Sequence, residues 1–193
     1  MKSIDHQYKI REIFYSIQGE GFWTGTACIF IRFFGCNLNC AFCDENRHKN
    51  FSLLTSMQVL TKLQSFPAKR IVLTGGEPLI QIKKMPEIIF QLKNAGYYLH
   101  LETNGTIPLP CDFDWITVSP KTADFISGDE LKLIFADQNL SEYEKYDFSH
   151  FFLQPKNYKN KINRNELTKV VNIIKENPDW QLSVQLHKFL KIK

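Results

Sequence analysis

Short apolar runs alternate with amphipathic segments along this chain of 193 residues. Runs rich in β-branched and aromatic residues predict strands at 28–33, 70–73, 97–101, 115–118, 131–135 and 151–153, with a seventh near 181–186. Apolar residues at helical spacing predict three helices, at 55–66, 86–96 and 163–177. Because helices separate several of the strands, the pattern favours right-handed βαβ units and a mostly parallel sheet.

Capping residues mark the ends of these helices. Thr55 and Gln58 have the spacing of a capping box at the start of the first helix. Gly96 stands where a left-handed residue would end the second helix. Asn163 and Glu166 form a similar cap at the start of the third.

The length of the chain limits the architecture. A complete eightfold barrel typically takes at least about 200 residues, and the segment 103–114 is too short and too rich in Gly and Pro for a crossover helix. We therefore expect an α/β fold, an incomplete open parallel barrel of about six strands and three helices. With no repeat or flexible linker in the sequence, residues 1–193 are expected to form one domain.

Composition excludes several classes of protein. Hydrophobic residues make up 44% and charged residues 23% of the chain, as in ordinary globular domains. The net charge of +4 does not indicate a nucleic-acid surface. No apolar run approaches the roughly 18 residues of a membrane span, so we expect a cytoplasmic protein that binds neither nucleic acid nor membrane. Three of the five cysteines fall within eight residues, which suits metal ligation better than disulfides.

The three clustered cysteines are Cys36, Cys40 and Cys43, directly after the first predicted strand. Thiolates bind both zinc and iron-sulfur clusters. In one interpretation, His48 completes a structural Cys3His zinc site. In the other, the three thiolates hold a 4Fe-4S cluster whose fourth iron stays open for a small molecule. The spacing alone leaves both interpretations open.

Polar motifs follow four further strands. They are Thr74–Pro78 (TGGEP), 102–105 (ETNG), 119–121 (SPK) and 154–157 (QPKN). Each could be only a turn. However, the carboxyl ends of parallel strands meet at one rim, where α/β proteins place their active sites. A structural zinc site would not require this convergence.

The CxxxCxxC motif with an aromatic residue before its last cysteine, together with GGEP, resembles the radical S-adenosylmethionine superfamily. The resemblance implies that Cys36, Cys40 and Cys43 hold a 4Fe-4S cluster and that the remaining motifs bind S-adenosylmethionine. The residues implied for that cofactor are Phe42, Cys43, Asp44, Gly75, Gly76, Glu77, Glu102, Asn104, Ser119, Pro120, Lys121, Gln154, Pro155, Lys156 and Asn157.

Further motifs, at 17–21 (IQGEG), Arg32 and 184–188 (VQLHK), resemble the 7-carboxy-7-deazaguanine synthase family. The resemblance implies a homodimeric lyase that converts 6-carboxy-5,6,7,8-tetrahydropterin to 7-carboxy-7-deazaguanine, a 7-deazapurine precursor of queuosine. A 5′-deoxyadenosyl radical would take a hydrogen atom from the pterin, the ring would contract and ammonia would leave. A flavodoxin or ferredoxin would supply electrons.

The same resemblance implies the substrate site. Arg32 would bind the substrate carboxylate, and the terminal carboxylate at Lys193 would turn back toward the substrate. The residues implied for substrate binding are Ile17, Gln18, Gly19, Arg32, Thr74, His187 and Lys193, and those implied for catalysis are Arg32, Glu20 and His187. Without the surrounding motifs, Arg32 would read as a surface ion pair and His187 as a core histidine.

Two positions depart from the family pattern. The family binds magnesium through a hydroxyl two residues after the third cysteine, where this chain has Glu45. A carboxylate could ligate magnesium or take its place. Leu186 stands where a threonine commonly precedes the histidine.

Two other functions remain as alternatives. A radical-generating activase would share the cysteine motif but would need no arginine to bind a pterin carboxylate. Loss of pterin turnover in an Arg32→Ala variant would therefore argue against an activase. A binding module with structural zinc would contain one zinc and no sulfide.

Overall fold

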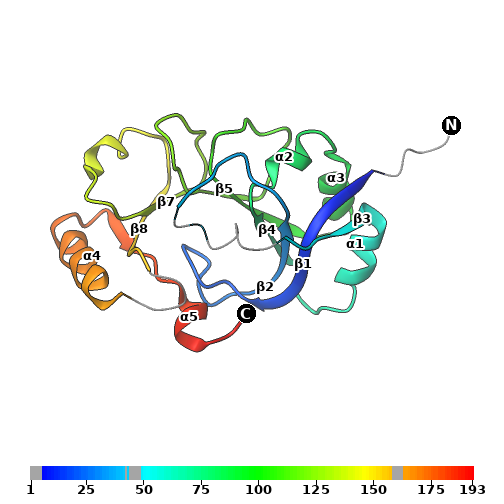
Figure 1. The fold of residues 1–193 in the computed structure, drawn as a ribbon, viewed down its shortest axis with the longest axis horizontal. Helices are drawn as coiled ribbons and strands as arrows, with labels where there is room; N and C mark the ends of the chain where they lie inside the picture. Colours follow the sequence, from blue (N-terminus) through cyan, green and yellow to red (C-terminus); the bar gives the residue numbers. More distant parts are fainter. Residues whose placement is uncertain (1–5, 42, 44–48, 158–162) are drawn as a thin grey trace.

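The computed structural model describes residues 6–41, 43, 49–157 and 163–193. Within them, nine strands form one open sheet in the order β3-β1-β2-β4-β5-β6-β7-β8-β9. The strands from β2 to β9 run parallel, whereas β1 pairs antiparallel with both β2 and β3. Figure 1 shows the sheet curving into an incomplete ring with helices on its outside. The expected open, mostly parallel α/β barrel is therefore confirmed.

The strands have the following bounds: β1 Gln7–Ile17, β2 Ala27–Phe33, β3 Ser52–Thr55, β4 Arg70–Gly75, β5 Tyr98–Thr103, β6 Trp115–Val118, β7 Glu130–Ile134, β8 His150–Gln154 and β9 Trp180–Leu182. The helices are α1 Ser56–Leu63, α2 Leu79–Ile82, α3 Glu87–Asn94, α4 Arg164–Glu176 and α5 Leu186–Leu190, with a 3-10 turn, η2, at Leu140–Glu142.

The helix ends follow the capping predictions. Thr55 and Gln58 form the reciprocal capping box of α1, and the Asn163 side chain accepts the Glu166 amide at the start of α4. Gly96 follows α3 with a φ of 77°, the left-handed conformation that glycine adopts without steric cost. The three predicted helices are thus confirmed.

Side chains alternate along the parallel strands between an outer and an inner face. Outward-facing apolar residues pack on the helices: Ile71, Leu73 and Leu99 belong to the core cluster that includes residues of α1, α2 and α3. Leu131 and Leu133 belong to a second cluster, which includes Val170 of α4. The inner face of the same strands therefore carries the polar residues that form the site.

The number of elements is larger than expected. Nine strands and five α-helices occur in the described part of the chain, against the predicted six or seven strands and three helices. Charged residues interrupt β1, and its register shifts between Ile10 and Glu12, which obscures its alternation. The other additions, β3, α2 and α5, have four, four and five residues, too few to show a period.

The C-terminal segment connects the two ends of the ring. In Figure 1, α5 and the C-terminus lie beside β2, although α5 follows β9 at the opposite edge of the sheet. The Leu186 amide donates to the Gly19 carbonyl at 2.9 Å. Among the described residues, no helix is long and apolar enough to cross a membrane.

Candidate active site

The segment that leads into the cysteine loop is hydrogen-bonded to Gly76 and Glu77 of the TGGEP motif. The Gly76 amide donates to the Phe33 carbonyl at 3.1 Å, and the Glu77 amide donates to the Gly35 carbonyl at 2.8 Å. A Cβ on Gly76 would lie 2.0 Å from the Gly35 carbonyl oxygen. This close approach of two backbones explains why the position requires glycine.

Glu77 lies beneath this loop and is fully buried. Its carboxylate accepts hydrogen bonds from the amides of Leu79 and Asn104, at 3.1 and 2.8 Å, and from the Thr103 hydroxyl at 2.9 Å. Burial raises its pKa, against the lowering effect of these bonds. In this structure Glu77 therefore joins two rim loops and is not part of the cavity lining, so its contact with S-adenosylmethionine stays a prediction.

A cavity of about 240 Å³ opens above these loops. All three clustered cysteines line it, together with residues from each of the four rim motifs. The predicted cofactor residues among its lining are Cys43, Gly75, Gly76, Glu102, Asn104, Ser119, Lys121 and Gln154. The structure thus brings together motifs that lie more than 100 residues apart in the chain.

The cysteine loop fits an iron-sulfur cluster. All three cysteines are free thiols, and Cys36 is exposed toward the cavity they share. Burial raises the pKa of Cys36, and the nearby Cys43 and Cys40 raise it further, so a positively charged group would stabilise the thiolates. Within the described residues no three His, Cys, Asp or Glu side chains are placed to ligate one metal ion. A four-iron cluster instead distributes its cysteines over separate iron atoms.

Some predicted residues fall outside the described part of the chain. They are Phe42 and Asp44, predicted to bind S-adenosylmethionine, Glu45, predicted at the magnesium site, and His48, the fourth ligand of the alternative zinc site.

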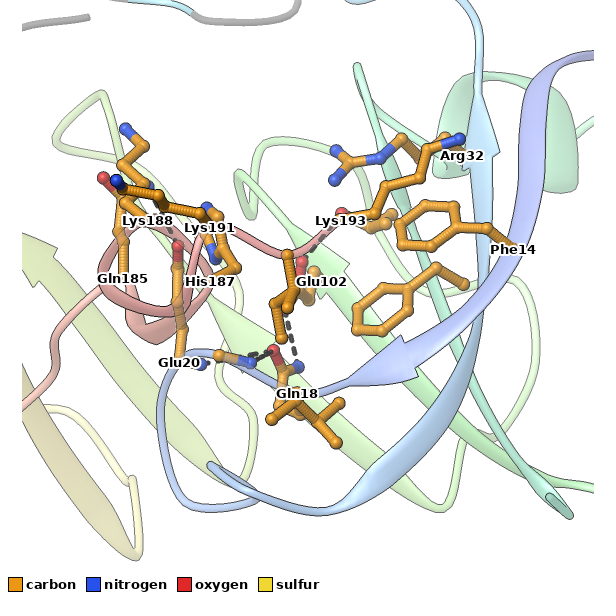
Figure 2. A pocket seen from close by; sticks show the side chains of 15 residues that line it. Phe14, Gln18, Glu20, Arg32, Glu102, Gln185, His187, Lys188, Lys191 and Lys193 are labelled. Carbon is orange, nitrogen blue, oxygen red and sulfur yellow. Dashed lines mark hydrogen bonds between the residues drawn. The ribbon is translucent and has the colours of Figure 1, made fainter. Parts of the chain in front are cut away.

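A second cavity, of about 540 Å³, adjoins the first. Figure 2 shows the side chains that line it, from β1 and β2 on one side and from α5 and the C-terminus on the other. Every residue that the sequence predicted for substrate binding lines this cavity: Ile17, Gln18, Gly19, Arg32, Thr74, His187 and Lys193. Glu20, predicted to be catalytic, also lines it.

Arg32 is held in place at one wall of this cavity. Its Nε lies 3.1 Å from a carboxylate oxygen of Glu12, and the other oxygen of Glu12 lies 2.6 Å from Lys193 Nζ. Both cations also lie over the Phe14 ring, at 5.4 and 5.0 Å from its centroid. Figure 2 shows Arg32 and Lys193 beside Phe14 at one end of the cavity, where the planar guanidinium suits an anionic group on a planar ligand.

The opposite wall places His187 against the β1–β2 connection. A Cβ on Gly19 would lie 2.8 Å from His187 Nδ1, so glycine allows the imidazole to approach the backbone. Burial lowers the pKa of His187, against the raising effect of Glu20. The imidazole is therefore neutral near pH 7 and can both donate and accept a hydrogen bond.

Four residues line both cavities: Glu20, Thr74, Glu102 and Gln185. Glu102 accepts from Thr74 Oγ1 at 2.7 Å and from Gln18 Nε2 at 3.0 Å. Although burial acts to raise it, the pKa of Glu102 falls to about 2, chiefly because of the Lys132 ammonium. Lys132 likewise holds the pKa of Glu20 below its usual value, again against burial. The wall between the cavities thus consists of charged and polar side chains that are hydrogen-bonded to one another.

Other predicted residues lie away from the cavities. Among the described residues, Pro120, Pro155, Lys156 and Asn157 do not line either one. Asn157 Nδ2 donates to Gln185 Oε1 at 3.0 Å, so it supports the shared wall from behind. These four positions stay predictions as cofactor contacts.

The sequence reasoning missed Phe14, Phe30, Gln185 and Lys132. Phe14 and Phe30 stack with centroids 4.9 Å apart and form an apolar wall of the larger cavity. This pair was missed because β1, the strand that carries Phe14 and pairs with β2, was not predicted. Lys132 did carry a signal, because it interrupts the leucines of a buried parallel strand, where a charge is costly.

Comparison with known proteins agrees with this geometry. The family model for the Radical SAM superfamily matches residues 30–177. The chain is 44% identical over 188 residues to a 7-carboxy-7-deazaguanine synthase from Bacteroides thetaiotaomicron, covering 96% of this chain and 98% of that protein. It is 35% identical to the enzyme of the same name from Haemophilus influenzae, covering 96% and 94%. The crystal structure of QueE from Escherichia coli is similar with a TM-score of 0.76 and 26% identity, covering 94% of this chain and 95% of that one.

Proposed function

Because the chain belongs to the 7-carboxy-7-deazaguanine synthase family within the Radical SAM superfamily, we propose that its two adjoining cavities bind the substrate and the cofactor of that family's reaction. The protein is a radical S-adenosylmethionine enzyme of queuosine precursor biosynthesis. Its superfamily uses a 4Fe-4S cluster and S-adenosylmethionine. The substrate in the proposal is 6-carboxy-5,6,7,8-tetrahydropterin, and the product is 7-carboxy-7-deazaguanine.

One observation carries the assignment of the cavities. The three cysteines and all seven predicted substrate residues line two cavities that share one wall. When bound, the cluster and S-adenosylmethionine supply the one-electron chemistry that removes a hydrogen atom from the substrate. The protein contributes a fixed distance between the two ligands, on which such a transfer depends.

In the larger cavity, the residues act by binding and orientation. Arg32 would bind the substrate carboxylate, with Glu12 holding its Nε. The terminal carboxylate at Lys193 would turn toward the substrate, while the Lys193 ammonium is held by the same Glu12. The neutral imidazole of His187 would hydrogen-bond to the ring system. The stacked Phe14 and Phe30 rings would exclude water from one side.

In the smaller cavity, Cys36, Cys40 and Cys43 would ligate the cluster. Asn104, Ser119, Lys121 and Gln154 are the polar side chains available to S-adenosylmethionine. Lys121 Nζ donates to Ser119 Oγ at 2.8 Å, and burial lowers the pKa of Lys121 to about 8.

The assignment is tested by anaerobic reconstitution of the cluster, followed by incubation with dithionite, S-adenosylmethionine and the carboxypterin. We expect 7-carboxy-7-deazaguanine by mass spectrometry. Formation of 5′-deoxyadenosine alone would mean that the substrate is wrong. If the intact cluster gave neither compound, the radical reaction itself would be refuted.

Magnesium is a further part of the proposal, with the Glu45 carboxylate as its ligand. Product formation in the same assay should rise on addition of magnesium, and Glu45→Thr, which supplies the family's hydroxyl, should keep that dependence. If Glu45 replaces the metal instead, the wild-type rate will not respond to magnesium, whereas Glu45→Thr will.

We also propose that the protein is a single-domain, cytoplasmic homodimer reduced by a flavodoxin or ferredoxin. The family resemblance supports the dimer, and the net charge of +4 suits acidic electron donors. Light scattering on the purified protein tests the dimer. Coupling to a flavodoxin that does not weaken with salt would contradict electrostatic docking.

A further inference from the structure

A buried lysine lies at the junction of the two cavities. Lys132, on β7, is only 6% exposed. Its Nζ lies 2.6 Å from Glu20 Oε2 and 3.9 Å from Glu102 Oε1. Lys132 lines the smaller cavity, whereas Glu20 and Glu102 each line both cavities.

The residues shared by the two cavities all depend on this ammonium. Glu20 and Glu102 contact it directly. Gln185 is linked to Lys132 through Glu20, because its Nε2 donates a hydrogen bond to Glu20 Oε1 at 3.0 Å. Thr74 is also linked to Lys132, through its 2.7 Å bond to Glu102.

The strand geometry explains how a lysine reaches this position. On β7, Leu131 and Leu133 pack in the outer core cluster with α4 residues, so Lys132 between them faces the interior of the ring. There it meets carboxylates from the β1–β2 connection and from β5. Burying two carboxylates without a cation would be strongly unfavourable.

We propose that Lys132 is a positioning residue that fixes the wall between the substrate and cofactor cavities and so sets how the two ligands face each other. It acts through Glu20 and Glu102, which in turn hold Gln185 and Thr74. The proposal rests on the function proposed above, because it assigns the two cavities to the substrate and to S-adenosylmethionine.

The expected defect is a loss of coupling between S-adenosylmethionine cleavage and product formation, and not simply a lower rate. With the wall displaced, S-adenosylmethionine can still be cleaved, but the substrate hydrogen lies in the wrong place. A misplacement of about 1 Å can cost on the order of a hundredfold in rate. The measured quantity is therefore the ratio of 7-carboxy-7-deazaguanine formed to 5′-deoxyadenosine formed.

The main variant is Lys132→Met, with Lys132→Gln made in parallel in case the methionine variant does not fold. We expect either one to lower the product ratio about tenfold or more, with cluster content and S-adenosylmethionine cleavage retained. Lys132→Arg, which keeps the charge, should restore part of the ratio.

The matched control is Leu133→Val, the neighbouring residue on β7 that faces the outer core. It should lower the melting temperature without changing the product ratio. An unchanged ratio in both neutral Lys132 variants, or an equal fall in Leu133→Val, would overturn the proposal. If the wild-type protein makes no product, the proposed function fails instead, so the two failures are distinguishable.

The pH profile gives a second readout. Removing the ammonium should raise the pKa values of Glu20 and Glu102 and move the acid limb of kcat/KM for the pterin to higher pH. The other charged or titratable groups near Lys132 are Glu130, Lys121 and His100. A purely structural role would leave the acid limb where the wild type has it.

Discussion

The two cavities differ in how the chain builds them. Most of the cofactor cavity is assembled from short motifs, each contiguous in sequence and each following a parallel strand, and side chains of the shared wall complete it. The substrate cavity is assembled from side chains on β1, β2, the β1–β2 connection and the C-terminal segment, with Thr74 and Glu102 from the shared wall. The cofactor cavity is therefore fixed by local backbone geometry, whereas the substrate cavity depends on α5, which closes the ring. A substitution in one cavity should therefore impair binding there without impairing binding in the other cavity.

The largest effect should come from the cofactor side. Cys36→Ala removes one of three cluster ligands, so we expect formation of both 5′-deoxyadenosine and product to fall to the no-enzyme background. Iron and sulfide analysis with the product assay measures this. Cys111→Ala, which removes a cysteine outside the motif, is the matched control and should retain activity. Residual turnover in Cys36→Ala would contradict the assigned ligand.

Arg32→Ala should damage only the substrate side. A hydrogen bond to a charged group contributes about 1.5–3 kcal/mol, so kcat/KM for the pterin should fall by about 10- to 150-fold. Uncoupled cleavage of S-adenosylmethionine should continue. Arg11→Ala is the control, since Arg11 lies 3.7 Å from the same Glu12 but does not line the cavity. Full pterin turnover in Arg32→Ala would contradict the assignment of Arg32 to the substrate carboxylate.

Gly19→Ala would test whether α5 closes the substrate cavity. The new Cβ would lie 2.8 Å from His187 Nδ1, so the imidazole must move. Overpacking of this kind costs about 1–3 kcal/mol, and we expect the KM for the pterin to rise about tenfold with cluster content unchanged. Gly25→Ala is a control with no atom within 4 Å of its Cβ, although its φ of +88° adds strain. A loss of iron in Gly19→Ala would show that the two cavities are not separable.

The smallest effect concerns the buried polar layer beneath the shared wall. Burial lowers the pKa of His100 to about 4. Its Nε2 forms a 2.6 Å hydrogen bond with the Thr117 hydroxyl, which donates to Glu130. Between pH 6.5 and 4 the unfolded chain binds a proton that the folded state excludes, so this histidine makes stability fall as the pH falls.

From pH 7 to 5.5 this contribution amounts to about 1 kcal/mol, or about 2–4 °C in melting temperature. Thermal melts of the wild type and of His100→Gln across that range measure it. The variant should lose less stability on acidification. Equal pH slopes for the two proteins would contradict a buried neutral histidine.

The amino-acid pattern alone was enough to predict the parallel α/β class, three helices with their caps, and the cysteine loop with the rim motifs. These features are local: a capping box, a glycine at positive φ or a motif at a strand end depends on neighbouring residues. Parallel strands bring their carboxyl ends to one rim, so the convergence of the motifs also followed from the sequence.

The contacts inside the ring could not be predicted from the local pattern. Nothing in the local pattern pairs Lys132 with Glu20 and Glu102, because a contact between residues 112 positions apart is set by strand register and curvature. The same holds for the bonds by which the buried Glu77 carboxylate joins its own loop to Thr103 and Asn104. It also holds for β1 and α5, whose short or interrupted patterns are stabilised by their neighbours in the fold and not by their own periodicity.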